Sequence, residues 1–130
     1  MRGTQGLTGQ ISQMINIMRY TRRIAYGLSS LIALSIIALS LSPLSKLPAV
    51  PGGDKTHHLI AYGALALPTA FGVPRKWLVL AVLYIALGGL IELIQPYVNR
   101  YGEWLDFAAN SAGVLIGTSI GIGVRRFSKA

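Results

Sequence analysis

The side chains of this sequence that could hold or transfer a proton gather in two short segments, residues 54–58 and 92–106. All of its acids and both of its histidines lie there: Asp54, His57, His58, Glu92, Glu103 and Asp106. Carboxylates and imidazoles are the usual general acids and bases near neutral pH, and they also bind metal ions. Any proton transfer or polar ligand binding is therefore expected at these two segments.

Helical spacing would bring several of these residues onto common faces. Asp54, His58 and Tyr62 are four residues apart and would share one helix face. Asp54 also follows two glycines, as an N-cap residue would. Glu92 and Gln95 are three residues apart near the end of another apolar stretch, so their side chains would be neighbours.

A third stretch passes from polar to very small residues along one face. Asp106, Asn110, Gly113 and Gly117 follow the spacing i, i+4, i+7 and i+11, and Gly121 continues the series. Small residues at this spacing allow a neighbouring helix to approach closely in a membrane. We therefore assign a helix-packing role to the glycines of this face: Gly113, Gly117 and Gly121.

The elements that must position these residues are membrane helices. Hydrophobic residues make up 52% of the chain, charged residues only 12%, and the mean hydropathy is +0.54. Such a composition is typical of a membrane protein. Four largely uncharged stretches approach the ~20 residues that a helix needs to cross a bilayer. They are residues 24–41, 57–73, 77–95 and 104–124.

The sequence thus predicts an all-α, polytopic membrane helix bundle with four transmembrane helices in one domain, residues 24–124. A cytoplasmic or interfacial segment, residues 1–23, precedes it, and a basic cytoplasmic tail, residues 125–130, follows it. Apolar residues on one face of the first segment predict a short helix on the inner leaflet. They are Leu7, Ile11, Met14, Ile15 and Met18. A disordered tail, or a signal peptide cleaved near Ala49, is the alternative at this end.

The distribution of positive charge predicts how the helices are oriented. Nine of the twelve basic residues flank the same ends of the helices: Arg2, Arg19, Arg22, Arg23, Arg75, Lys76, Arg125, Arg126 and Lys129. The other three are Lys46, Lys55 and Arg100. Because basic residues accumulate on the cytoplasmic side, we expect a multi-pass protein of the cell membrane with both termini in the cytoplasm. The net charge of +8 then reflects topology, and no nucleic-acid partner is expected.

Burial in a bilayer constrains the acids. A charged side chain within the membrane costs about 2.5 to 3.5 kcal/mol on insertion scales, so Glu92 and Asp106 should face the bundle interior and find partners there.

Several kinds of site are disfavoured by the sequence. There is no cysteine and no glycine-rich phosphate loop, so no thiolate chemistry and no cofactor are expected. A metal site formed by His57 or His58 with Glu92 and Asp106 has usable ligand types, but it is disfavoured because adjacent histidines of a helix point about 100° apart and could rarely both bind one ion. We therefore expect no metal ion.

Three ordered motifs resemble the VanZ-like family of small multi-pass membrane proteins. They are Asp-Lys-x-x-His at residues 54–58, Glu-x-x-Gln at residues 92–95 and Asp-x-x-x-Asn-x-x-Gly at residues 106–113, with Arg100 between the last two. The likeness covers about residues 46–121. The histidine of the family's first motif corresponds to His58 rather than His57. The resemblance implies a membrane protein of the cell envelope, and the family takes its name from a member associated with low-level teicoplanin resistance.

Our leading hypothesis is that a cluster of polar residues at the outer ends of the helices binds a polar or anionic envelope ligand, such as a lipid-linked precursor, and influences teicoplanin susceptibility. The cluster is Asp54, Lys55, His58, Glu92, Gln95, Arg100, Asp106 and Asn110. Lys55 and Arg100 would contact the anion, and the carboxylates would orient them. Membrane lipids are further expected partners. Glu103 is interpreted as a loop charge.

Two other functions fit the same residues. In one, the chain is a structural or accessory subunit whose glycine face docks another membrane protein, while the polar cluster only fixes how the helices pack. In the other, it is an enzyme in which Glu92 or Asp106 is the general base and His58 the acid. Short loops leave little to exclude water from such a site, which favours a non-enzymatic role.

Overall fold

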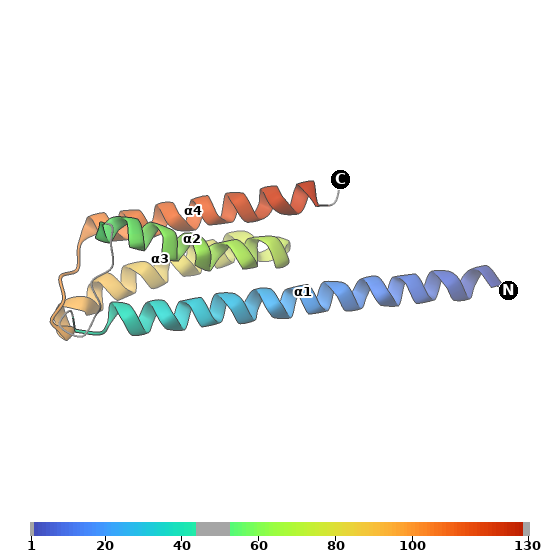
Figure 1. The fold of residues 1–130 in the computed structure, drawn as a ribbon, viewed down its shortest axis with the longest axis horizontal. Coiled ribbons are helices and arrows are strands. Elements are labelled where there is room, and N and C mark those ends of the chain that lie inside the picture. Colours follow the sequence, from blue (N-terminus) through green and yellow to red (C-terminus); the bar gives the residue numbers. More distant parts are fainter. Residues whose placement is uncertain (1, 44–52, 129–130) are drawn as a thin grey trace.

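The computed structural model describes residues 2–43 and 53–128, and every regular element within them is helical. In chain order the elements are α1 (Arg2–Ser40), α2 (Asp54–Gly72), the 3-10 helix η2 (Pro74–Lys76), α3 (Trp77–Ile94), the 3-10 helix η3 (Gln95–Val98) and α4 (Trp104–Phe127). The four long helices lie side by side, and α1 extends well beyond the others at its N-terminal end (Figure 1). The prediction of an all-α bundle is confirmed for these residues.

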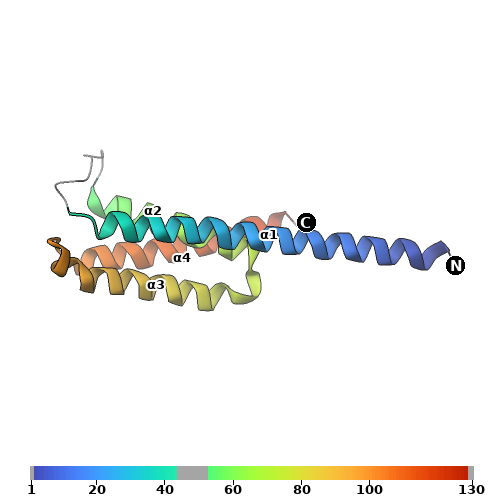
Figure 2. The same cartoon turned by 90° about the horizontal axis from the view of Figure 1, so that it is seen from below.

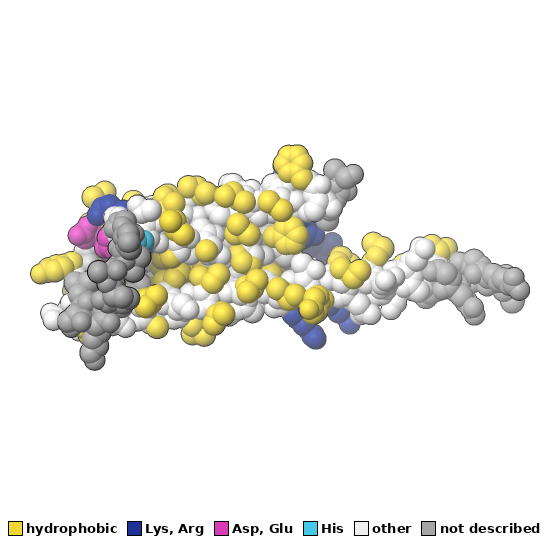
Figure 3. Space-filling model, viewed as in Figure 1, with side chains coloured by type: hydrophobic (Ala, Val, Ile, Leu, Met, Phe, Trp, Pro, Cys, Tyr) yellow, Lys and Arg dark blue, Asp and Glu magenta, His cyan; other side chains and the backbone are white. Residues whose placement is uncertain are grey.

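Three helical stretches are long and apolar enough to cross a membrane: Gly9–Ser40, Pro74–Val98 and Trp104–Phe127. Apolar side chains cover the outside of the bundle along its length, whereas charged side chains collect near its ends (Figure 3). Leu31, Val79 and Leu83 are examples of large apolar side chains that are more than half exposed. A surface of this kind would be unstable in water, so the chain is a multi-pass membrane protein.

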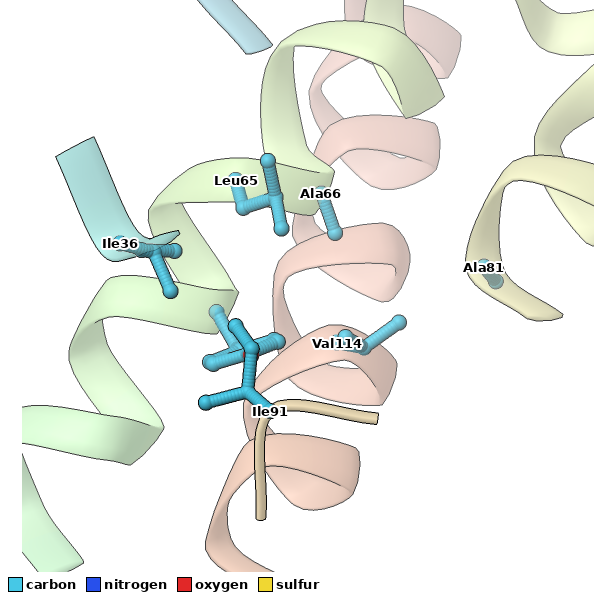
Figure 4. Close-up of a cluster of buried hydrophobic side chains, with 7 residues drawn as sticks. Ile36, Leu65, Ala66, Ala81, Ile91 and Val114 are labelled. Atoms are coloured by element: carbon cyan, nitrogen blue, oxygen red, sulfur yellow. The ribbon is translucent and has the colours of Figure 1, made fainter. Parts of the chain in front are cut away.

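The remaining long helix, α2, is more polar and lies at the centre of the bundle. It lies between α1 and α4, and Figure 2 shows α3 on the far side of the bundle from α1. The hydroxyl of Ser29 in α1 donates a hydrogen bond to the carbonyl oxygen of Leu65 in α2 over 2.8 Å. Buried apolar side chains from all four long helices meet around α2 (Figure 4): Ile36, Tyr62, Leu65, Ala66, Ala81, Ile91 and Val114. Because α2 is covered on several sides, it needs fewer lipid-facing apolar residues than its neighbours.

The predicted short interfacial helix is not a separate element. α1 is one helix of 39 residues, or roughly 58 Å at 1.5 Å per residue, about twice the thickness of a hydrocarbon core. No proline interrupts it, and the hydroxyl of Thr21 bonds back to the carbonyl of Ile17 at 2.9 Å where the two segments were expected to meet. The side chains of Arg2, Lys46 and Lys129, which entered the prediction of orientation, lie outside the described part of the chain.

The N-cap prediction for Asp54 is wrong. Gly53 occupies the N-cap in an extended conformation, and Asp54 is the first residue of α2. An acid in the first turn still interacts favourably with the helix dipole. Its carboxylate remains available to contact side chains one turn further along α2.

The glycine face of α4 packs on α2 of the same chain. A Cβ atom at Gly113 would overlap the carbonyl of Leu59, and one at Gly117 would overlap the backbone of Gly63. Further along, a Cβ atom at Gly121 would lie 2.6 Å from the carbonyl oxygen of Leu67. The two parallel helices therefore approach each other to a distance that only glycine permits.

Replacing Gly117 with alanine should therefore destabilise the bundle. The new methyl group would meet backbone atoms of α2, which cannot rotate away, so we expect the free energy of unfolding to fall by about 1–3 kcal/mol. Denaturation of the purified protein by SDS, followed by circular dichroism, would measure the change.

Gly123→Ala in the same helix is the matched control. Nothing lies within 4 Å of a Cβ atom built there, so this variant should be as stable as the wild type, or more stable by up to about 1 kcal/mol because alanine favours the helix. Equal losses of stability in both variants would contradict the close packing of α2 and α4.

Candidate functional site

The predicted cluster lies at one end of the bundle. The start of α2, the end of α3 with η3, and the start of α4 meet there, and we call it the polar end. Magenta carboxylates and a cyan imidazole mark it in Figure 3. Glu92 and Asp106 are 9% and 3% exposed, so both acids face the interior, as the cost of burying a charge in lipid required.

His58 lies among residues from two helices. Its Nε2 atom is 3.8 Å from Oδ1 of Asp54 and 3.7 Å from Oδ2 of Asp106. Its Nδ1 atom is 2.9 Å from Oδ1 of Asn110, which is fully buried. The nitrogen of Asn110 donates to Oε1 of Glu92 over 3.4 Å. The oxygen of Asn110 therefore accepts from His58, which requires the hydrogen of the imidazole to be on Nδ1.

Glu92 accepts hydrogen bonds from several sides. Besides Asn110, the backbone N–H of Glu103 donates to its Oε2 atom over 3.0 Å. Gly102 permits this contact, because a Cβ atom there would overlap the carbonyl of Glu92 and push the loop away. Gln95 is 1% exposed, and in the amide orientation that satisfies both of its polar atoms it donates to Oε2 of Glu92 over 2.9 Å. The buried carboxylate is thus held in one position.

Lys55 pairs with two acids, Asp106 in the first turn of α4 and Glu103 at the N-cap of the same helix. Its ammonium group is 3.0 Å from Oε2 of Glu103 and 3.5 Å from Oδ1 of Asp106. Glu103 therefore does not stand apart as a loop charge. It pairs with the only lysine of the predicted cluster.

Arg100 points away from the carboxylates. Its Nη1 atom donates to the carbonyl oxygens of Leu39 and Ser42, at 3.5 and 3.4 Å. Both carbonyls lie at the C-terminal end of α1, where carbonyl oxygens lack the N–H partners of a helix interior. The carbonyl of Leu39 also accepts the backbone N–H of Ser42 over 3.3 Å. The guanidinium group caps α1 and ties it to the loop between α3 and α4.

One residue that was not assigned to the cluster belongs to it: Glu103, through Lys55 and Glu92. Tyr62 is part of the apolar core instead; it is 1% exposed, and its hydroxyl has no hydrogen bond partner among the described residues. The helical spacing of Tyr62 from Asp54 and His58 predicted a shared face, whereas no local pattern marks Glu103.

A cavity of about 310 Å³ lies beside the cluster, between α3 and α4. Its lining is mostly apolar, with two acids: Gly89, Glu92, Leu93, Pro96, Gly102, Glu103, Trp104 and Phe107. The rings of Trp104 and Phe107 meet edge to face with their centres 6.2 Å apart. The cavity thus combines apolar walls with hydrogen bond acceptors, which is typical of a site for a small amphiphilic molecule.

The polar end carries a surplus of negative charge. Among the described residues, the carboxyl groups of this end outnumber its lysine and arginine side chains by four to two: Asp54, Glu92, Glu103 and Asp106 against Lys55 and Arg100. Such an arrangement attracts cations and hydrogen bond donors. An anion would have to displace the carboxylates from Lys55, or the carbonyls of α1 from Arg100.

Comparisons of this chain with protein-family models, with curated proteins and with solved structures found no match. The resemblance to the VanZ-like family stays a prediction made from the three motifs.

The position of Arg100 predicts a structural effect of its replacement. In Arg100→Gln the carbonyl of Ser42 loses its side-chain donor and the carbonyl of Leu39 keeps only the N–H of Ser42, which should lower the free energy of unfolding by about 0.5–1.5 kcal/mol. Hydrogen exchange measured by mass spectrometry should become faster in residues 36–42.

Arg126→Gln is the matched control, because Arg126 is an exposed arginine at the opposite end of the bundle. It should leave exchange in residues 36–42 unchanged. Unchanged exchange in Arg100→Gln as well would mean that the guanidinium group does not cap α1.

Proposed function

We propose that this chain is an integral membrane protein of the cell envelope with four spans, both termini in the cytoplasm and the polar end facing outward. The position of α2 between α1 and α4 supports the fourth span, because a helix packed along its neighbours crosses the membrane with them. Its 19 residues correspond to roughly 28 Å, close to the ~30 Å of a hydrocarbon core.

Arginines at the other end of the bundle support this orientation. Arg19, Arg22, Arg75 and Arg125 come from α1, η2 and α4 and line one cleft. The positive-inside rule assigns such an end to the cytoplasm.

The orientation can be tested because the chain has no cysteine of its own. Tyr101 and Phe127 are 82% and 84% exposed and lie at opposite ends of the bundle. A membrane-impermeant maleimide should label Tyr101→Cys in intact spheroplasts, and should label Phe127→Cys only after permeabilisation. The reverse pattern would overturn the proposed orientation, and equal labelling of both before permeabilisation would contradict an odd number of crossings between them.

The polar end binds the headgroup of a lipid-linked envelope component in this proposal. The observation that carries it is the cavity between α3 and α4, in which Leu93, Trp104 and Phe107 provide apolar contacts beside the carboxylate of Glu92. An amphiphile could reach it from the membrane, place its chain against the apolar walls and direct its headgroup toward Glu92.

The charges of the site favour a headgroup that donates hydrogen bonds or carries a positive charge. Lys55 is paired with Glu103 and Asp106, and Arg100 with carbonyls of α1, so neither is free to act as the primary contact for an anion. Hydroxyl and ammonium groups suit the carboxylates better.

The resemblance to the VanZ-like family adds a phenotype to the proposal, namely an influence on teicoplanin susceptibility. The accessory-subunit alternative would need a docking surface other than the glycine face of α4, because α2 covers that face.

Blocking the cavity should remove the ligand. Leu93→Trp would fill the space beside Glu92, and Glu92→Gln would remove the negative charge. We expect native mass spectrometry of protein purified in mild detergent to show a bound envelope lipid in the wild type, and at least a tenfold smaller bound fraction in both variants. In a strain whose teicoplanin susceptibility depends on the protein, both variants should behave like the deletion.

Leu90→Trp is the matched control, since Leu90 is an exposed leucine of α3 that does not line the cavity. It should keep the lipid and the wild-type susceptibility. A lipid fraction that is unchanged in Leu93→Trp and Glu92→Gln at normal protein levels would refute the proposed site.

A further inference from the structure

We infer that Asp54, His58 and Asp106 bind one divalent transition-metal ion. The inference rests on the proposed function, because the proposed orientation is what gives water access to the polar end. Each of the three residues offers one ligand atom, and the three atoms lie within 4.8 Å of one another. The sequence alone disfavours a metal ion because the two adjacent histidines, His57 and His58, could rarely bind the same ion. The structure brings a different set together, from the first two turns of α2 and the first turn of α4.

The distances within this set suit a metal ion better than hydrogen bonds. Nε2 of His58 is 3.8 Å from Asp54 Oδ1 and 3.7 Å from Asp106 Oδ2, both too long for a hydrogen bond. A tetrahedral ion with bonds of ~2.0–2.2 Å would hold its ligand atoms roughly 3.3–3.6 Å apart. The two distances from Nε2 need to shorten by only a few tenths of an ångström, and the two carboxylates, whose oxygens lie within 4.8 Å of each other, would move together around the ion.

Asn110 holds the imidazole in the orientation that metal binding needs. It accepts the hydrogen of Nδ1 over 2.9 Å, so Nε2 faces the two carboxylates, and its lone pair is available to a metal ion when the ring is neutral. Metal-bound histidines are held in this way, with the second ring nitrogen donating to a fixed acceptor. Asn110 is itself fixed, because its nitrogen donates to Glu92.

The charge of the polar end also calls for a cation at this point. The side chain of Asp106 is 4% exposed, and a buried carboxylate is stable only when its charge is compensated. Lys55 lies 3.5 Å from Oδ1 of Asp106 but is held by Glu103 at 3.0 Å. Oδ1 has no hydrogen bond partner among the described residues, and Oδ2 faces His58. A divalent ion at Oδ2 would compensate the surplus of carboxylates.

The set of ligands indicates which ions fit. One imidazole with two carboxylates suits Zn²⁺, Mn²⁺ or Fe²⁺ better than Ca²⁺ or Cu⁺. Three protein ligands leave at least one coordination position open to water or to a headgroup oxygen. Asp54 is largely exposed, which gives the ion a path from solvent.

The test is direct metal binding to the full-length protein, purified in detergent, stripped with EDTA and desalted. Isothermal titration with Zn²⁺ and with Mn²⁺, together with the metal content after dialysis, should show about one bound ion in the wild type. His58→Gln and Asp106→Asn should bind at least tenfold more weakly. His57→Gln should bind like the wild type, because it changes the same residue type one position away.

Asp54→Asn removes a ligand with little risk of unfolding the protein, because the side chain of Asp54 is exposed and not part of the packed interior. It therefore separates loss of the metal site from loss of the fold. It should keep the wild-type circular dichroism and still bind at least tenfold more weakly. Absence of wild-type binding up to about 1 mM of either ion, or unchanged affinity in Asp54→Asn and His58→Gln, would overturn the inference. A wild-type protein that carries the lipid in mass spectrometry but binds no metal would overturn the metal site alone. A wild-type protein that binds metal but carries no lipid would overturn only the proposed lipid ligand.

Discussion

The contact between the backbones of α2 and α4 determines the rest of the structure. At Gly113 and Gly117 no side chain fits between the two helices, so their relative register is set within a fraction of a turn. Asn110 lies one turn before Gly113, and His58 lies next to Leu59, whose carbonyl faces Gly113. The hydrogen bond between His58 and Asn110 is therefore a direct result of the glycine packing.

The polar end is a chain of contacts rather than a set of separate charges. His58 bonds to Asn110, Asn110 to Glu92, and Glu92 to the backbone of Glu103, whose side chain holds Lys55. In the low dielectric of a membrane protein an unpaired polar group is costly, so each of these groups depends on its neighbour for a hydrogen bond or an opposite charge. A ligand or a metal ion that binds at one point would therefore affect the others.

The sequence alone predicted the helices and most of the polar cluster, because long apolar stretches and regular spacing are local patterns. It failed where the outcome depends on contacts between distant segments. The pairing of Lys55 with Glu103 and the capping of α1 by Arg100 join residues more than forty positions apart. The length of α1 was missed for another reason: charged and polar residues suggested a boundary near residue 23, but neither proline nor an N-cap geometry interrupts the helix there.

The central claim is that Asn110 fixes the imidazole of His58 so that Nε2 faces Asp54 and Asp106. Nitrogen-15 NMR of the histidine side chain tests it most directly, with metal-free His57→Gln protein at a pH where the ring is neutral and its two nitrogens give distinct shifts. We predict that Nδ1 carries the hydrogen and Nε2 does not, and that Asn110→Ala abolishes this preference. A hydrogen on Nε2 in the metal-free protein would contradict the account.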